Sequence, residues 1–226
     1  MLKKVSVIIL WAVAFAYVEA SVVEYLRALY HPLGKGGFAF PLPTLEQMQM
    51  MGDEHFRRVL IELGRESATL VMLAAAAAVA AKNRREGWAY FVVAFGVWDI
   101  FYYVWLKIFL DWPESLMTWD LLFLLPVPWV SPVAAPVIIS IVMIISGLTV
   151  LGFEARNRPL AAGWGHWAAL TAGGSIIVVS FCLDYKNIMA GGFPNPFNWS
   201  LFLIGLGAGV ASFAALVGRG LFIRWA

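Results

Sequence analysis

The sequence is poor in the residues that several kinds of active site require. Its single cysteine, Cys182, excludes an internal disulfide and leaves no cysteine-based metal spacing. The chain has no Cys-x-x-Cys-His, Walker A or Gly-x-Ser-x-Gly motif, which argues against c-type haem, P-loop nucleotide hydrolysis and α/β-hydrolase chemistry. Charged residues make up only 13% of the chain, and the basic ones flank apolar segments. We therefore expect no nucleic-acid partner.

The composition is instead strongly apolar, with 62% hydrophobic residues and a mean hydropathy of +0.79. A membrane-spanning helix needs about 20 mostly apolar residues. Six segments meet this requirement, at residues 5–29, 60–81, 88–110, 133–153, 167–184 and 201–223. Their connections are too short for a separate soluble domain. The sequence therefore predicts an all-α integral membrane protein, a six-helix bundle forming one domain over residues 1–226.

The basic residues predict how this bundle is oriented. Cytoplasmic loops of membrane proteins carry an excess of Lys and Arg. The segments on one side carry Lys3, Lys4, Lys82, Arg84, Arg85, Arg156, Arg158 and Arg224, and those on the other side carry Lys35, Arg57, Arg58 and Lys186. We therefore expect a multi-pass protein of the cytoplasmic (inner) membrane, embedded in the lipid bilayer, with both termini inside.

Residues 119–130 form an apolar run that is too short to cross the bilayer. Pro126 and Pro128 interrupt helical hydrogen bonding within it. Such a segment either lies at the interface or re-enters the membrane, where its backbone must be buried in protein or line a cavity. The sequence leaves both alternatives open.

Three acids, Glu19, Glu66 and Asp99, lie inside apolar spans with no basic residue three or four positions away. A rise of ~1.5 Å per residue places the first two roughly 10 Å below the outer boundary. Carboxylates at this depth are costly and usually face a bundle interior or a cavity. We expect them to be neutralised by protons, by Arg65 or by a bound cation.

Other polar residues fall on the same helix faces in the outer halves of the first three spans. Some have a local explanation, because Glu24 with Arg27, Arg58 with Glu62, and Lys107 with Asp111 are spaced to pair within one helix. The candidate binding residues are Glu19, Glu24, Arg27, Glu62, Arg65, Glu66, Asp99, Tyr103 and Asp184.

Three functions fit these residues. The first is binding or carrying a small molecule or ion, with proton coupling, in a carboxylate/Arg pocket open to the outer face. The second is a membrane enzyme or respiratory subunit that uses a quinone, or a metal ion held by Glu19, Glu66, Asp99, His31 and His55, although the Glu-x-x-His repeat of di-metal bundles is absent. The third is a structural subunit, paired with other membrane subunits or with copies of itself. No motif assigns a catalytic residue or selects a cofactor.

Overall fold

The computed structural model describes residues 1–30, 50 and 53–222, with the side chains of all but residues 26–30, 53–56, 59 and 222 in these ranges. Among these residues, six helices are long and apolar enough to span a membrane, as the sequence predicts. They are α1 (Leu2–Tyr30), α3 (Asp53–Ala80), α4 (Arg84–Leu110), α5 (Ala134–Ala155), α6 (Trp164–Cys182) and α8 (Trp199–Phe222).

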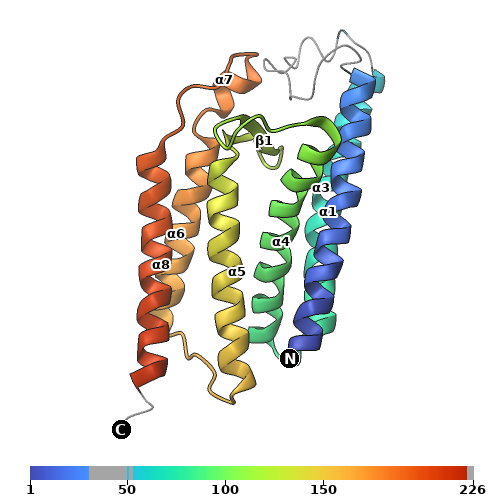
Figure 1. The fold of residues 1–226 in the computed structure, drawn as a ribbon. Coiled ribbons are helices and arrows are strands. Elements are labelled where there is room, and N and C mark those ends of the chain that lie inside the picture. The colour runs from blue at the N-terminus through green and yellow to red at the C-terminus, as the bar shows by residue number, and fades with distance from the viewer. Residues whose placement is uncertain (31–49, 51–52, 223–226) are drawn as a thin grey trace.

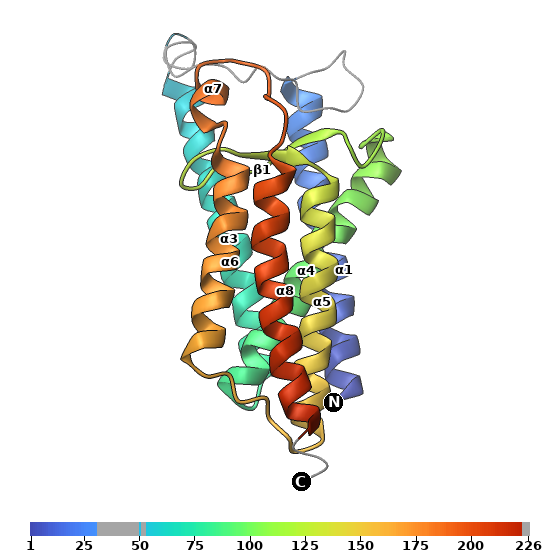
Figure 2. The same cartoon turned by 90° about the vertical axis from the view of Figure 1, so that its left-hand side faces the viewer.

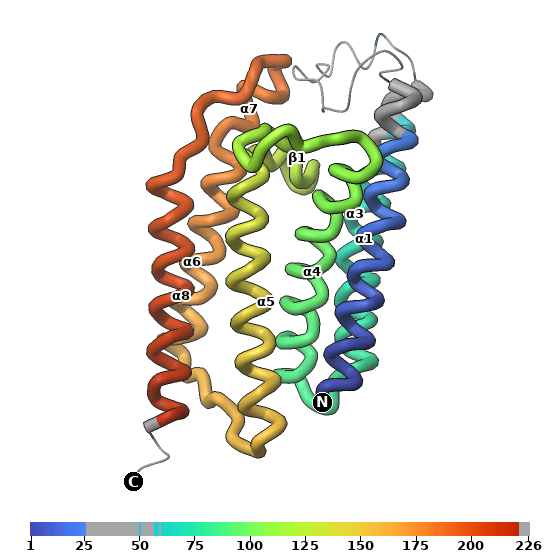
Figure 3. Tube along the Cα trace, viewed as in Figure 1, coloured from blue at the N-terminus to red at the C-terminus, as the bar shows by residue number. Residues whose placement is uncertain are grey.

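The six helices run side by side along one direction (Figure 1). Helix α4 packs against α1 and α3 on one side and against α5 on the other, and α6 packs against α8. Helix α1 begins and α8 ends at the same end of the bundle (Figure 3). This agrees with an even number of spans, while the side of the membrane on which that end lies stays a sequence prediction.

The helices present large apolar side chains outward. Each of the six has at least one, and examples are Leu10, Val79, Ile108, Ile145, Val179 and Ile204. Soluble monomers rarely expose apolar surface on every side. The exterior of the bundle therefore suits lipid better than water.

Helices α6 and α8 approach closely because glycines meet between them. A Cβ atom on Gly173 would lie 2.7 Å from the carbonyl oxygen of Gly205, and a Cβ on Gly205 would lie 2.7 Å from the carbonyl oxygen of Gly173. Small residues at such crossings let helix backbones come together in membranes. This pair fixes α6 and α8 as a unit, which Figure 2 shows from the side.

A β-hairpin joins α4 to α5. Strands β1 (Trp119–Phe123) and β2 (Trp129–Pro132) are antiparallel, with Asp120 opposite Ser131 and Leu121 opposite Val130. The sequence predicted an interfacial or re-entrant segment here but not strands. Strand pairing satisfies backbone groups on both sides of the turn that contains Pro126 and Pro128, where a helix would be interrupted. Asp120, Val130 and Ser131 are buried, so the hairpin is part of the packed protein.

The hairpin and the short helix α7 (Tyr185–Met189) lie at the end of the bundle opposite the termini (Figure 1). If the termini are cytoplasmic, the hairpin covers the outer end of the bundle. The polar residues that the sequence singles out are gathered beneath it.

Candidate functional site

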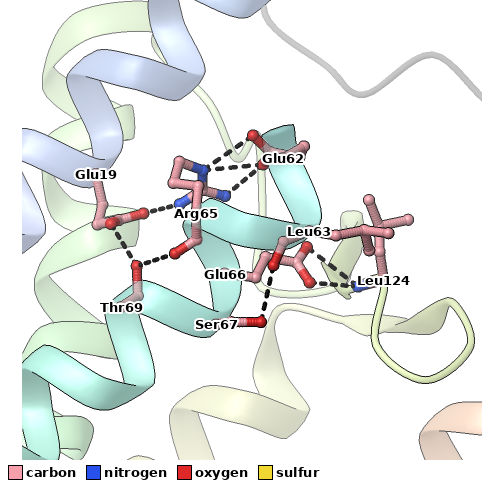
Figure 4. A network of polar contacts seen from close by, with 8 residues as sticks. All are labelled: Glu19, Glu62, Leu63, Arg65, Glu66, Ser67, Thr69 and Leu124. Carbon is pink, nitrogen blue, oxygen red and sulfur yellow. Dashed lines mark hydrogen bonds and ion pairs between the residues drawn. The ribbon is translucent and has the colours of Figure 1, made fainter. Parts of the chain in front are cut away.

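An arginine on α3 joins two helices through their carboxylates. The Nε atom of Arg65 donates to both carboxylate oxygens of Glu62, at 3.0 Å each, and its terminal nitrogens form ion pairs with Glu62 and with Glu19 of α1 (Figure 4). Because Glu62 lies one helical turn before Arg65, it orients the guanidinium toward α1. We call Glu19, Glu62, Arg65 and Thr69 the arginine cluster.

Thr69 completes the arginine cluster. Its hydroxyl lies 2.6 Å from the second carboxylate oxygen of Glu19 and 3.0 Å from the carbonyl oxygen of Arg65. Both oxygens of Glu19 are therefore engaged, although α1 supplies none of the partners. Glu19 is 5% exposed. The side chains of Glu62 and Arg65 are each about a quarter exposed, at 26% and 25%, so this end of the cluster is less buried than Glu19.

Glu66 follows Arg65 in α3 but points to the other side of the helix, toward the hairpin (Figure 4). Its two carboxylate oxygens accept the backbone N–H of Leu124, at 3.0 and 3.1 Å. Leu124 directly follows β1, so this contact fastens the tip of the hairpin to α3. A charged acceptor for a backbone N–H is one of the stronger hydrogen bonds in proteins.

Asp99 is held by α5. The hydroxyl of Ser140 donates to it at 2.8 Å. A close helix crossing makes this possible, because a Cβ on Gly96 would lie only 2.6 Å from the carbonyl oxygen of Ser140. Asp99 is 9% exposed and Ser140 1%.

Tyr103, one turn beyond Asp99, donates its hydroxyl to Asp120 of β1 at 3.0 Å. Asp99 and Asp120 are near enough to interact electrostatically. We call Asp99, Tyr103, Asp120 and Ser140 the aspartate cluster. The hairpin thus contributes Asp120 to the aspartate cluster and binds Glu66 through Leu124.

The structure confirms that Glu19, Glu66 and Asp99 are buried and that Arg65 is a counter-ion of Glu19. It gives the three acids different immediate partners. The predicted pair of Lys107 with Asp111 is confirmed at 2.7 Å, whereas the sequence did not predict that Arg65 binds Glu62.

Two predicted binding residues of the outer half lie apart from these contacts. Glu24 is half-buried near the end of α1. Asp184 bonds to Asn195 through the backbone N–H at 2.8 Å and the amide at 2.6 Å, and to Asn187 at 3.1 Å. It therefore shapes the loop that follows α7. The side chains of Arg27, His31 and His55 lie outside the described residues.

No group of three or more His, Cys, Asp or Glu side chains in the described part of the chain is arranged to hold a metal ion. Glu19, Glu66 and Asp99 thus do not form a metal centre among themselves. His31 and His55, the other predicted ligands, are not covered by this finding.

Sequence reasoning missed the partners of two of the acids. Leu124 binds through its backbone N–H, so its side chain gives no indication of the contact. Ser140 does carry a signal, since it is a lone hydroxyl in the first half of an apolar helix, where a buried polar group requires a partner.

Comparison with known proteins gives no assignment: no protein-family model, no curated protein and no solved structure matches this chain. The fold supports a multi-pass helical membrane protein, and its function has to be argued from the site.

Proposed function

We propose that this protein binds, and carries across the cytoplasmic membrane, a small cation or cationic molecule in exchange for protons. The site is formed by the arginine cluster, Glu66 and the aspartate cluster, and it is reached from the outer face. Both termini lie in the cytoplasm in this proposal.

The observation that carries the proposal is an excess of carboxylates over cations. Glu19, Glu62, Glu66 and Asp99 lie within spans of α1, α3 and α4, and Arg65 is the cation that forms ion pairs with members of this set among the described residues. Four carboxylates and one guanidinium cannot all be charged in a low-dielectric setting without added positive charge. Protons and a cationic ligand can each supply that charge.

Protons and the cation replace each other in the site because its negative charge must be neutralised in either state. A cation that enters the site favours the charged carboxylates and displaces protons from them, and its departure reverses the process. The total charge of the site stays nearly constant, so neither state places a large uncompensated charge within the bilayer. Counted in residues from the outer end of its helix, Asp99 is expected to lie deeper than Glu19 and Glu66. Its partner Ser140 is a neutral hydrogen-bond donor and supplies no positive charge.

Two unpaired donors support ordered water near the site. The indole nitrogens of Trp98 and Trp129 are buried without a hydrogen-bond partner in the described part of the chain. Trp98 precedes Asp99, and the ring of Trp129 lies 5.6 Å from that of Phe123, next to Leu124. Buried donors are nearly always satisfied in folded proteins, so an ordered water molecule fits both positions.

The test is proton movement in proteoliposomes that contain the purified protein and an internal pH dye. Sodium, potassium, magnesium, manganese and choline chlorides are applied one at a time. We expect at least one of them to drive proton flux, and Asp99→Asn to abolish it while the protein still inserts. Asn keeps the shape of the side chain and can still accept from Ser140.

The matched control is Glu114→Gln, which removes a negative charge from an exposed position between α4 and the hairpin. This variant should retain the flux. Full flux in Asp99→Asn, or no cation-dependent flux in the unaltered protein, would refute the proposal.

A further inference from the structure

A polar pocket lies at the end of the bundle opposite the hairpin, between the first turns of α6 and the second half of α8. These helix segments are side by side in both views (Figures 1 and 2). The pocket has a volume of about 490 Å³ and is open to the outside. None of its residues takes part in the proposed outer site.

The polar lining of this pocket consists of a histidine, a serine hydroxyl and one fixed positive charge. Arg219 comes from α8, and His166 Nδ1 of α6 lies 3.2 Å from the hydroxyl oxygen of Ser212 on α8. No acidic side chain lines the pocket, and the described part of the chain provides no carboxylate partner for Arg219. The chemistry of the lining therefore selects an anion.

The remaining lining residues are small and leave room for a ligand. Gly163 and Gly165 expose backbone at the start of α6, and a Cβ on either would meet nothing within 4 Å. Ala169 and Ala208 form an apolar wall deeper along the two helices. The pocket thus has the cationic Arg219 at one end and an apolar wall at the other. This combination matches an anionic group attached to a hydrocarbon chain.

The surroundings place the pocket at the level of lipid headgroups. Trp164 and Trp167 beside it are exposed, at 90% and 50%, and tryptophans of this kind collect at membrane interfaces. Arg156 and Arg158, in the connection from α5, are exposed at the same end and add positive charge. Basic pockets between transmembrane helices are known to hold anionic lipid headgroups.

We propose that this pocket, the basic pocket, binds the phosphate of an anionic phospholipid. Arg219 pairs with the phosphate, and an acyl chain lies along Ala169 and Ala208. The hydrogen-bonded pair of His166 and Ser212 donates one further hydrogen bond, from the Ser212 hydroxyl or from His166 Nε2–H according to the tautomer. The inference does not rest on the proposed transport function, because it uses other residues at the other end of the bundle.

The test measures lipid adducts of the purified full-length protein by native mass spectrometry, with phosphatidylglycerol and phosphatidylcholine as probes. We expect preferential binding of phosphatidylglycerol, weakened roughly tenfold by Arg219→Gln, as the loss of one charge-assisted hydrogen-bonded contact implies. The matched control, Arg158→Gln, removes the same charge at the same end but outside the pocket and should bind nearly normally.

A second variant fills the basic pocket without changing its charge. Ala208→Phe should also reduce phosphatidylglycerol binding, whereas equal binding by all three variants and the unaltered protein would overturn the proposal. An equal loss in Arg219→Gln and Arg158→Gln would overturn it too, because it would indicate only general attraction. Inorganic phosphate tests the source of the phosphate group: binding of the free ion but not of phosphatidylglycerol would contradict the lipid assignment.

Discussion

The carboxylate of Glu66 accepts the backbone N–H of Leu124 with both of its oxygens, at 3.0 and 3.1 Å. This contact joins α3 to the tip of the hairpin that closes one end of the bundle. An acid of the proposed site is therefore also the attachment point of its cover. A change in the charge of Glu66 alters the strength of that attachment, because a carboxylate is a stronger acceptor than a neutral acid.

The first prediction concerns this attachment. Glu66→Ala leaves the Leu124 N–H without its acceptor and should lower the stability by about 1–3 kcal/mol. Hydrogen exchange in residues 119–132 should increase more than exchange in α5 or α8. Thermal unfolding in detergent and exchange mass spectrometry measure the two effects.

Glu66→Gln is the control for the first prediction, because its amide oxygen still accepts from Leu124. It should keep most of the stability and of the protection of the hairpin. If Gln and Ala at this position behave alike, the hydrogen bond does not hold the hairpin.

The second prediction concerns the arginine cluster. Arg65→Gln leaves the carboxylates of Glu19 and Glu62 without their guanidinium and should destabilise the protein by about 2 kcal/mol, between the values for exposed and buried ion pairs. Adding Glu19→Gln to this variant should recover part of the lost stability, because it removes one of the two unpaired negative charges.

A double-mutant cycle on Arg65 and Glu19, followed by thermal unfolding, measures the coupling. We expect a coupling of roughly 0.5–3 kcal/mol, as for other residues in direct contact. Strictly additive effects would show that the two side chains do not interact in the membrane.

The third prediction concerns the crossing of α4 and α5. A methyl group at position 96 would lie 2.6 Å from the carbonyl oxygen of Ser140, so Gly96→Ala should push α5 away from Asp99. The expected cost is about 1–3 kcal/mol, typical of overpacking, together with a loss of cation-dependent proton flux. Unfolding and flux in proteoliposomes measure both.

Gly152→Ala is the matched control for the crossing. Gly152 lies inside α5 with nothing within 4 Å of an added Cβ. Alanine there should leave the flux unchanged and stabilise the helix by up to ~1 kcal/mol. Equal effects of the two substitutions would contradict the role of the close crossing.

Much of the fold could be predicted from the sequence, because the requirement for about 20 apolar residues per span leaves a strong signal. The burial of Glu19, Glu66 and Asp99 follows from the same reasoning, since charged groups avoid lipid. The hairpin could not be predicted in this way. Its strands are short, and their pairing depends on the helices that bury them.

The candidate site was predictable in its residues more than in its contacts. Glu19 and Arg65 belong to different helices, and their meeting depends on how each helix is rotated in the bundle. The hydrogen bond from Ser140 to Asp99 likewise requires the close crossing at Gly96. Local spacing did identify Lys107 with Asp111, but it assigned Glu62 to Arg58 and missed its contact with Arg65.

The most direct test of the account is a proton count on the purified protein. A cation that drives flux in proteoliposomes is added to the protein in weakly buffered detergent solution, and the released protons are followed with a pH electrode. The account predicts proton release on binding by the unaltered protein and a markedly smaller release by Asp99→Asn. Cation binding without any proton release, or the same release by both proteins, would contradict it.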